Sequence, residues 1–429
     1  MNYKGITFKY IYSACTIVKT PDLSILSDPW FTEGIMDGSW FHGTKIKDPL
    51  KTISNVDMIY ISHIDPDHYD PIFLRKYFKR FGKKKIIISN HKHNHLYKKM
   101  KSDGFNPTIL DKELKIGKTE LTIIPHDTGS ISDIDSAFIV KFYDKNKTHC
   151  LVNTNDIVID KKILQTIKQK LKGVKVNLLA CGYTGAGPYP QTYFKLGSKK
   201  LTNEIRKKEK LFENVYKEVT NFFKSDYNIP FAGEYFLGGF LAKYNKYKGN
   251  PDPIKVKRYD KKALIFKTGG EINTFNYKKT KIRNKKIPNS VILQRLKEIK
   301  NKQMDYERLM SLEEVNQLPL KRLLLSAVNK AKKFSEYNKD YFYVIRLNKK
   351  EFSVINVNKS RKNSVFFKKD KKNLPTPRSE ITIDPRYLFG LLTNVYHWNN
   401  AEGGSHYLSN RTPNKYNPKA HRFLNFLSI

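Results

Sequence analysis

Short apolar runs separated by turn residues dominate residues 1–190. Several alternate with polar positions or are continuously apolar, which is the pattern of half-buried and fully buried strands. The runs predicted as strands are TFKYIY, TIVKT, SILSDP, MIYISH, KIIISN, LTIIPHD, SAFIVKFYD, HCLVNTND and VNLLACG. Helical stretches such as PIFLRKYFKRF and KKILQTIKQKLKG lie between them. This alternation predicts an α/β domain with a substantial sheet.

The rest of the chain predicts a long charged helix from about Thr202 to Ser225 and then an aromatic, glycine-rich segment, PFAGEYFLGGF, expected to form a pocket wall. A single core stops growing at roughly 250 to 300 residues, so 429 residues favour two domains. A basic, Asn-rich stretch places the boundary between residues 1–270 and 271–429. After two helices, the strands DYFYVIRL, EFSVINV and NSVFFK predict a small C-terminal α+β domain.

The chain is strongly basic, with 80 Lys+Arg against 40 Asp+Glu and a formal net charge of +40. Such a positive charge is typical of proteins that bind nucleic acids. However, the lysines are spread over the whole chain, and the densest runs fall between periodic segments, where solvated loops are the default. A nucleic-acid partner is therefore disfavoured. The electrostatic field of this net positive charge would also attract an anionic small-molecule substrate.

No apolar stretch is long enough for a membrane helix, and the N-terminus alternates like a strand rather than a signal peptide. Cys15, Cys150 and Cys181 are widely spaced and form no CxxC pair. We therefore expect a soluble, cytoplasmic protein with reduced thiols and no membrane partner.

The sequence SHIDPDH provides the strongest chemical signal. It places His63, Asp65, Asp67 and His68 in the turn between the buried strand MIYI and a helix. Four metal-ligating side chains within six positions can converge on one or two cations without any long-range contact. The alternative interpretation is a turn with helix-capping carboxylates.

Two further candidates follow later strands: His126 in IIPHDTG and Asp156 in LVNTND. Each is weak alone, because a histidine or an Asn-Asp pair is ordinary at a strand end. Their order along the chain is informative. A strand with HxDxDH, a strand with His and a strand with Asp resemble the ligand order of the metallo-β-lactamase superfamily, and SILSDPWF, with Asp28, resembles the strand and turn that commonly precede its motif.

This resemblance implies a metallo-β-lactamase-like αββα sandwich with two divalent metal ions. One ion would be held by His63, Asp65 and His126, and the second by Asp67 and His68. Asp156 would span them, and either Asp67 or Asp156 would orient a bound hydroxide in a hydrolytic reaction.

Two positions depart from the superfamily pattern. Asp65 replaces an imidazole, which shifts the expected metal from zinc toward iron or manganese. The final histidine is not evident, because VNLLACG runs into YTGAGPYPQTY. The second metal site is thus expected to be incomplete, water-filled or completed from elsewhere. The sequence HKHNH (His91, His93, His95) is a possible metal clip, but we favour a solvated helix N-terminus and leave it out of the ligand set.

Three later segments resemble the CMP-N-acetylneuraminate hydroxylase branch and its bacterial relatives: YTGAGPYPQTY, PFAGEYF and WNNAEGGSHYLSNRTPNKY. The C-terminal segment is interpreted either as a turn anchoring the small domain, with Trp398 in its core, or as a lid over the metal site. The predicted substrate-binding residues are Tyr183, Trp398, Asn399, Asn400 and Arg411. That branch also carries a Rieske centre, for which this sequence has no close Cys and His pairs, so oxygen chemistry would need an external electron donor.

The sequence therefore predicts a metal-dependent enzyme. The favoured function is an iron oxygenase that hydroxylates an anionic, N-acylated or nucleotide-activated sugar-like substrate. The alternative is a zinc- or manganese-dependent hydrolase of an amide or ester. A third hypothesis is a non-catalytic nucleic-acid-binding protein that retains the fold.

Overall fold

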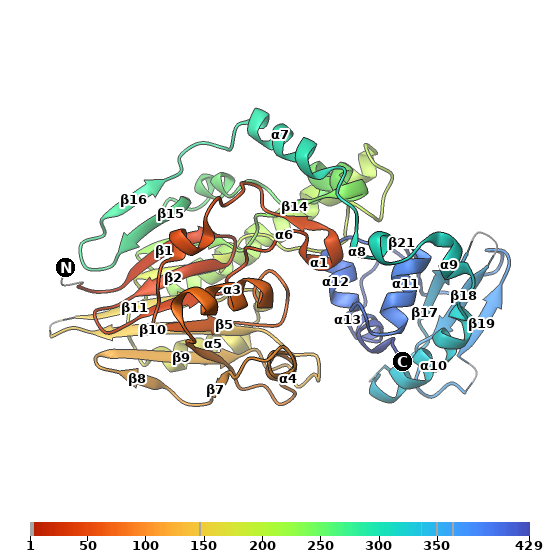
Figure 1. The fold of residues 1–429 in the computed structure, drawn as a ribbon, viewed down its shortest axis with the longest axis horizontal. Helices are drawn as coiled ribbons and strands as arrows, with labels where there is room; N and C mark the ends of the chain where they lie inside the picture. Colours follow the sequence, from red (N-terminus) through yellow and green to blue (C-terminus); the bar gives the residue numbers. More distant parts are fainter. Residues whose placement is uncertain (1–3, 146, 336, 349–350, 363) are drawn as a thin grey trace.

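The computed structural model describes residues 4–145, 147–335, 337–348, 351–362 and 364–429. Two large sheets form its first part (Figure 1). Across the eight-stranded sheet the order is β16 (Lys279–Ile282), β15 (Phe266–Asn273), β1 (Thr7–Tyr12), β2 (Cys15–Lys19), β3 (Ser24–Ser27), β5 (Met58–Ile61), β6 (Lys85–Ser89) and β7 (Thr108–Leu110). Across the six-stranded sheet it is β13 (Tyr227–Phe231), β12 (Leu178–Gly182), β11 (Thr148–Asn153), β10 (Ser136–Tyr143), β9 (Thr119–Pro125) and β8 (Leu114–Ile116).

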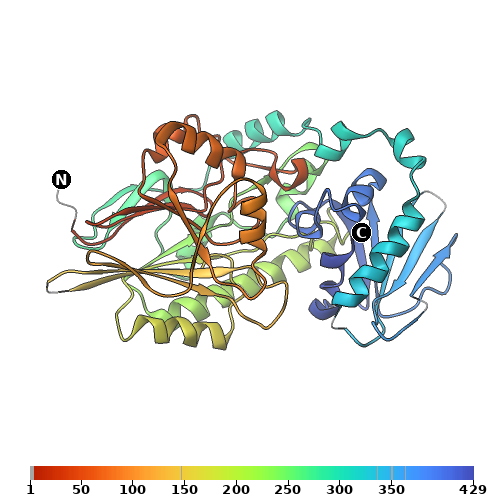
Figure 2. The ribbon, with the colours of Figure 1, turned by 60° about the horizontal axis from the view of Figure 1, so that its bottom comes forward.

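The two sheets share one apolar core. Phe8 and Tyr60 of the first sheet pack in the same buried cluster as Phe138 and Leu151 of the second. Helices cover the outer faces, with one on each side in Figure 2: the orange α3 and the yellow α5. These covering helices are α3 (Pro71–Phe81), α4 (His95–Ser102), α5 (Lys161–Leu171) and α6 (Lys199–Phe223). The αββα sandwich predicted from the sequence is confirmed.

Parallel pairing determines where the site forms. β3, β5 and β6 pair in parallel in one sheet, and β11, β12 and β13 do so in the other. The carboxyl ends of parallel strands lie at the same edge of a sheet, so the loops that follow β5 and β11 can meet there. Their burial on both faces explains the continuous apolar runs MIYI and LLAC.

A smaller five-stranded sheet forms the C-terminal part. Its order is β19 (Val365–Lys368), β18 (Phe352–Asn356), β17 (Phe342–Arg346), β20 (Arg378–Ile383) and β21 (Tyr407–Thr412). Its helices are α10 (Leu320–Phe334), α11 (Pro385–Leu392), α12 (Trp398–Gly403), α13 (Pro418–His421) and η3 (Leu424–Phe426). This arrangement is the small α+β unit expected from the sequence.

Shorter elements join these parts. They are α1 (Ile35–Gly38), β4 (Trp40–Phe41), α2 (Pro49–Ile53), β14 (Phe236–Leu237), η1 (Gly239–Tyr247), η2 (Pro253–Arg258), α7 (Asn289–Ile299), α8 (Asp305–Leu309) and α9 (Leu312–Asn316). The predicted boundary after residue 270 falls within β15, which pairs with β1, so strand pairing places residues 271–282 with the first sheet. The division into two folding domains stays a prediction. Among the described helices, none combines the length and apolar character that crossing a membrane requires.

Candidate metal centre

The loop after β5 holds four of the predicted ligands. A tight turn, in which the amides of His68 and Tyr69 both donate to the Asp65 carbonyl, folds the segment back on itself. His63 Nε2 lies 3.6 Å from Asp65 Oδ2, and His68 Nε2 lies 3.4 Å from Asp67 Oδ2. Each imidazole therefore has a carboxylate of the same loop beside it.

Asp156 joins this loop from the end of β11. Its Oδ2 lies 3.5 Å from His68 Nε2, and the rings of His63 and His68 have centroids 3.9 Å apart. His63, His68 and Asp156 each offer one ligand atom, and these three atoms all lie within 4.8 Å of one another. The structure thus brings together side chains from two sheets that are about ninety residues apart in the chain.

Asp28 supports the cluster from the turn after β3. It is fully buried and accepts hydrogen bonds from the Ser62 amide at 2.7 Å and the Ser62 hydroxyl at 2.8 Å. Its Oδ2 also lies 3.1 Å from His68 Nδ1. Because Nδ1 of His68 faces Asp28, Nε2 is the nitrogen that faces Asp67 and Asp156. A carboxylate behind an imidazole fixes the ring and its tautomer in many metal sites.

Asp135 is a site residue that the sequence analysis missed. It lies in the loop between β9 and β10, and its Oδ1 is 3.5 Å from His63 Nδ1. Burial, together with the charges of Asp156 and Asp65, raises the pKa of Asp135 to about 6, although His63 opposes this shift. The sequence carries no distinctive signal for Asp135, because an aspartate immediately before a buried strand is ordinary turn chemistry.

His126 lies outside the compact cluster of His63, His68 and Asp156. Its amide donates to the Asp135 carbonyl at 2.9 Å, which holds it beside that loop. Its buried Nε2 has no hydrogen-bond partner among the described residues. The role of His126 as a ligand stays a prediction.

The histidines of HKHNH divide between two environments. Asn94 caps α4, which begins at His95, and His95 Nε2 lies 2.8 Å from the Ile131 carbonyl. His93 is exposed, as expected for a helix N-terminus. His91 is different, because burial lowers its pKa to about 4 and the charges of His126 and His63 act on it.

The protonation of the cluster follows from its packing. Burial and His68 lower the pKa of His63, but Asp135 and Asp65 outweigh them and raise it to about 9. Burial lowers the pKa of His68, but Asp67, Asp156 and Asp28 raise it well above its ordinary value. Burial raises the pKa of Asp156, but His68 holds it below its ordinary value. Without a cation, imidazolium groups balance the carboxylates.

The residues present fit a divalent cation. His68 Nε2 and His126 Nε2 are buried without a hydrogen-bond partner among the described residues, although a buried polar atom normally has one. Imidazole nitrogens and carboxylate oxygens are the donors that iron, manganese and zinc accept. A cation bound among these groups would displace the imidazole protons. It would then balance the negative charge of the carboxylates in their place.

The predicted substrate-binding residues mostly contact protein. Trp398 is buried, and its Nε1 donates to the Leu427 carbonyl at 3.3 Å. Asn400 donates to Asp37 Oδ1 at 3.1 Å, and the Asn399 amide donates to His397 Nδ1 at 3.2 Å. These contacts suit the anchoring interpretation of the segment, and a role in substrate binding stays a prediction.

Arg411 and Tyr183 occupy different places. The guanidinium of Arg411 lies over Tyr193 and Tyr416, with its carbon 4.5 and 4.8 Å from the ring centres, and donates to the Tyr193 hydroxyl. It therefore joins the loop after β12 to the small sheet. Tyr183 is buried in the wall of a cavity that part of the segment PFAGEYFLGGF also lines, as was expected of that segment.

His397 of the C-terminal part lies within electrostatic range of the metal centre. The charge of His397 acts on Asp65, and the charges of Asp65 and His95 act on His397. His397 is exposed, but desolvation of its ring by the neighbouring chain lowers its pKa. This histidine was noted in the sequence only as part of a polar C-terminal segment.

Comparisons with known proteins give distant similarities. No family model matches the chain. A cytidine monophosphate-N-acetylneuraminic acid hydroxylase from Danio rerio is 30% identical over 86 residues, which cover 20% of this chain and 15% of that protein. The chain therefore matches much less than two thirds of that relative.

Solved structures align with about half to two thirds of the chain at low identity. An isothiocyanate hydrolase from Delia radicum gut bacteria is 12% identical, covering 62% of this chain and 98% of that chain with a TM-score of 0.42. A possible metal-dependent hydrolase from Veillonella parvula is 13% identical, covering 63% and 100% with a TM-score of 0.45. CmlA, a diiron β-hydroxylase from Streptomyces venezuelae, is 13% identical, covering 53% and 45% with a TM-score of 0.37.

Proposed function

We propose that the chain is a metal-dependent enzyme with two cations, an oxygenase that hydroxylates an anionic small molecule. The supporting observation is that the imidazoles of the compact cluster lie beside four carboxylates, three of which are proposed as ligands. The carboxylates are Asp65, Asp67, Asp135 and Asp156, and the imidazoles are His63 and His68. Such a set favours iron or manganese over zinc, and iron with imidazole and carboxylate ligands is the centre of many non-haem oxygenases.

The proposed ligands follow the sequence analysis. His63, Asp65 and His126 would hold one cation, Asp67 and His68 the second, and Asp156 would lie between them. When bound, the metal pair supplies a centre that activates dioxygen. In the overall reaction one oxygen atom enters a C–H bond of the substrate as a hydroxyl, and the other leaves as water with two electrons and two protons from an external reductant.

The protein's own groups have separate tasks. Asp28 orients the His68 ring, as its 3.1 Å contact with Nδ1 requires. The net charge of +40 would draw an anionic substrate toward the site. The short match to a sugar-acid hydroxylase supports an N-acylated or nucleotide-activated sugar-like substrate.

The test is elemental analysis of anaerobically purified protein, combined with an absorption spectrum before and after exposure to air. We expect about two irons per chain and a spectral change that depends on oxygen. Asp67→Ala should lose metal while retaining its circular dichroism spectrum, and His93→Ala, an exposed histidine nearby, is the matched control.

Other outcomes would contradict the proposal. Tightly bound zinc without a response to oxygen would favour a hydrolase of an amide or ester. Absence of metal would favour the nucleic-acid-binding hypothesis, which predicts binding that weakens steeply between two salt concentrations in a filter assay. Full metal occupancy in Asp67→Ala would refute the ligand assignment.

A further inference from the structure

A large cavity lies beside the sandwich. Its lining does not include the compact cluster of His63, His68 and Asp156. Its volume is about 1060 Å³. This is close to the upper end of the volumes of small-molecule sites, which are roughly 300 to 1,000 Å³. Its walls come from the loop between β13 and β14, the turn after η1, and the segment that joins β16 to α7 and passes over the sandwich in Figure 1. None of the proposed metal ligands lines it.

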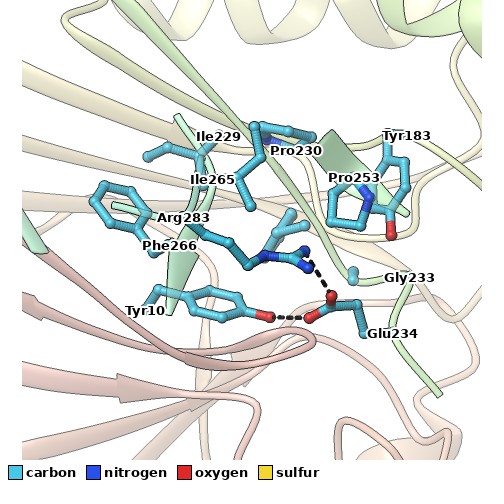
Figure 3. A pocket seen from close by; sticks show the side chains of 12 residues that line it. Tyr10, Tyr183, Ile229, Pro230, Gly233, Glu234, Pro253, Ile265, Phe266 and Arg283 are labelled. Carbon is cyan, nitrogen blue, oxygen red and sulfur yellow. Dashed lines mark hydrogen bonds and ion pairs between the residues drawn. The ribbon is translucent and has the colours of Figure 1, made fainter. Parts of the chain in front are cut away.

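The walls of this cavity carry an excess of positive charge. The lysines that line it are Lys246, Lys248, Lys267, Lys285 and Lys286, and among the described residues none has a carboxylate within ion-pair distance. The two acidic residues in the lining are both bound by Arg283, at 2.9 Å to Glu234 and 3.1 Å to Asp252. Figure 3 shows Arg283 and Tyr10 both joined to Glu234. The positive charges of these lysines are therefore not balanced by carboxylates of the cavity wall and can attract an anionic ligand.

Lys248 is the buried member of this group, with 5% of its surface exposed. Its ammonium donates to the Tyr235 carbonyl and lies 3.7 Å from the centre of the Tyr235 ring. An ammonium has three donors, and these contacts use one of them. Burial and the charge of Lys208 hold the pKa of Lys248 well below its ordinary value. A nearby anion would stabilise the charged form.

Three further donors in the lining have no partner. The hydroxyls of Tyr183 and Tyr235 and the amide nitrogen of Asn250 are buried and make no hydrogen bond within the described part of the chain. Buried polar groups in folded proteins nearly always have a partner. An acceptor with several oxygens would satisfy these three donors together with the buried ammonium.

We propose that this cavity binds a phosphate-bearing small molecule, with Lys248, Asn250, Tyr183 and Tyr235 donating to its oxygens. Several lysines on the walls match an anion of more than one charge, and phosphate offers more acceptor oxygens than a single carboxylate. Tyr235 also connects the cavity with the metal centre, because the charge of Asp67 acts on its hydroxyl. The statement that the bound anion is part of the substrate rests on the proposed function, whereas anion binding itself does not.

Calorimetric titration of the full chain with inorganic pyrophosphate tests the site. We expect Lys248→Met to weaken binding at least about tenfold, because it removes the charge and keeps the stem. Tyr235→Phe removes one hydroxyl from the wall and should weaken binding by about threefold or more. Lys243→Gln, on η1 just before the turn of Lys248 but outside the lining, should remain within about twofold of the wild type.

His68→Ala separates this site from the metal centre. We expect its affinity for pyrophosphate to equal that of the wild type even when its metal is lost. A lower affinity in this variant would mean that the metal binds the anion and would overturn the proposal. Absence of binding to the wild type, or equal affinity in Lys248→Met and Tyr235→Phe, would also overturn it. Zinc in place of iron would refute the oxygenase but leave this result unchanged.

Discussion

A single buried carboxylate determines which nitrogen of His68 is available to a metal. Asp28 accepts two hydrogen bonds from Ser62, which fixes its orientation, and its Oδ2 is then 3.1 Å from His68 Nδ1. The carboxylate accepts the proton of Nδ1, so Nε2 is the nitrogen that would lose its proton and offer its lone pair to a bound cation on the side of Asp67 and Asp156.

Asp28→Asn should therefore weaken metal binding by about 10- to 100-fold with little loss of stability. The amide can still accept from the Ser62 backbone, but its NH2 group can donate to His68 Nδ1 and move the ring proton to Nε2. The measurement is metal affinity by competition with a chelator. Asp48→Asn, which changes an exposed cap of α2, is the control. Equal affinity in the two variants would show that Asp28 does not set the tautomer.

The site was predictable where its residues are close in sequence. SHIDPDH needs only one turn to bring four candidate ligand groups together, and Asp156 was indicated by the order of motifs, which resembles that of the metallo-β-lactamase superfamily. Asp135 could not be recognised, because its contact with His63 depends on how the loop after β9 folds across the sheet edge. The approach of His397 to Asp65 depends on domain packing, which local patterns do not encode.

At the scale of elements, β9 and β10 contain a buried ion pair in an otherwise apolar sheet. Glu120 and Lys141 are opposite each other in the antiparallel register, and both are almost fully buried. Lys141 Nζ lies 3.0 Å from Glu120 Oε1 and donates to the Lys170 carbonyl at 2.7 Å. This second contact joins the sheet to α5.

Removing one partner of this pair should lower the free energy of unfolding more than replacing both. Glu120→Ala leaves the Lys141 ammonium buried without a counter-ion and should lower the free energy of unfolding by about 3 kcal/mol. The double variant Glu120→Leu with Lys141→Met should recover most of that loss. Urea denaturation followed by circular dichroism measures both. A double variant less stable than Glu120→Ala would show that the pair contributes net stability.

Strands with continuous or alternating apolar residues were predictable, and β15 was not. MIYI, KIIIS and LTIIP appear in the structure as β5, β6 and part of β9. β15 has the sequence FKTGGEIN, in which two glycines interrupt the pattern. It becomes a strand because it pairs with β1, which is about 260 residues away, and local propensity carries no information on such a partner.

At the scale of the molecule, α1 is one of the places where the small domain attaches to the sandwich. Asp37 accepts from the Tyr387 hydroxyl at 2.6 Å and from the Asn400 amide at 3.1 Å. The carbonyl of the preceding residue, Met36, is 2.7 Å from His406 Nε2. Asp37 is in the left-handed region, with φ of 57°, so the attachment also depends on an uncommon backbone conformation.

Ionisation of Asp37 should weaken this attachment. Burial raises its pKa from 3.8 to about 6, despite the hydrogen bonds from Tyr387 and Asn400. The folded protein thus binds this proton more tightly than the unfolded chain, so the contribution of Asp37 to stability increases as the pH falls from 6 toward 4. Above pH 6 the carboxylate is charged in both states, and its desolvation penalty is fully present.

Asp37→Asn mimics the protonated carboxyl and should remove this dependence. At pH 7 the variant should be more stable than the wild type by about 1 to 2 kcal/mol, after allowance for partial exposure, and the difference should shrink toward pH 4.5. Comparing the two proteins at each pH cancels other groups, including His406, whose pKa burial lowers to about 4 and which acts in the opposite direction. Thermal melts at pH 7, 6, 5 and 4.5 provide the measurement. A stability difference that stays constant over this range would show that Asp37 does not titrate at the attachment between the two parts.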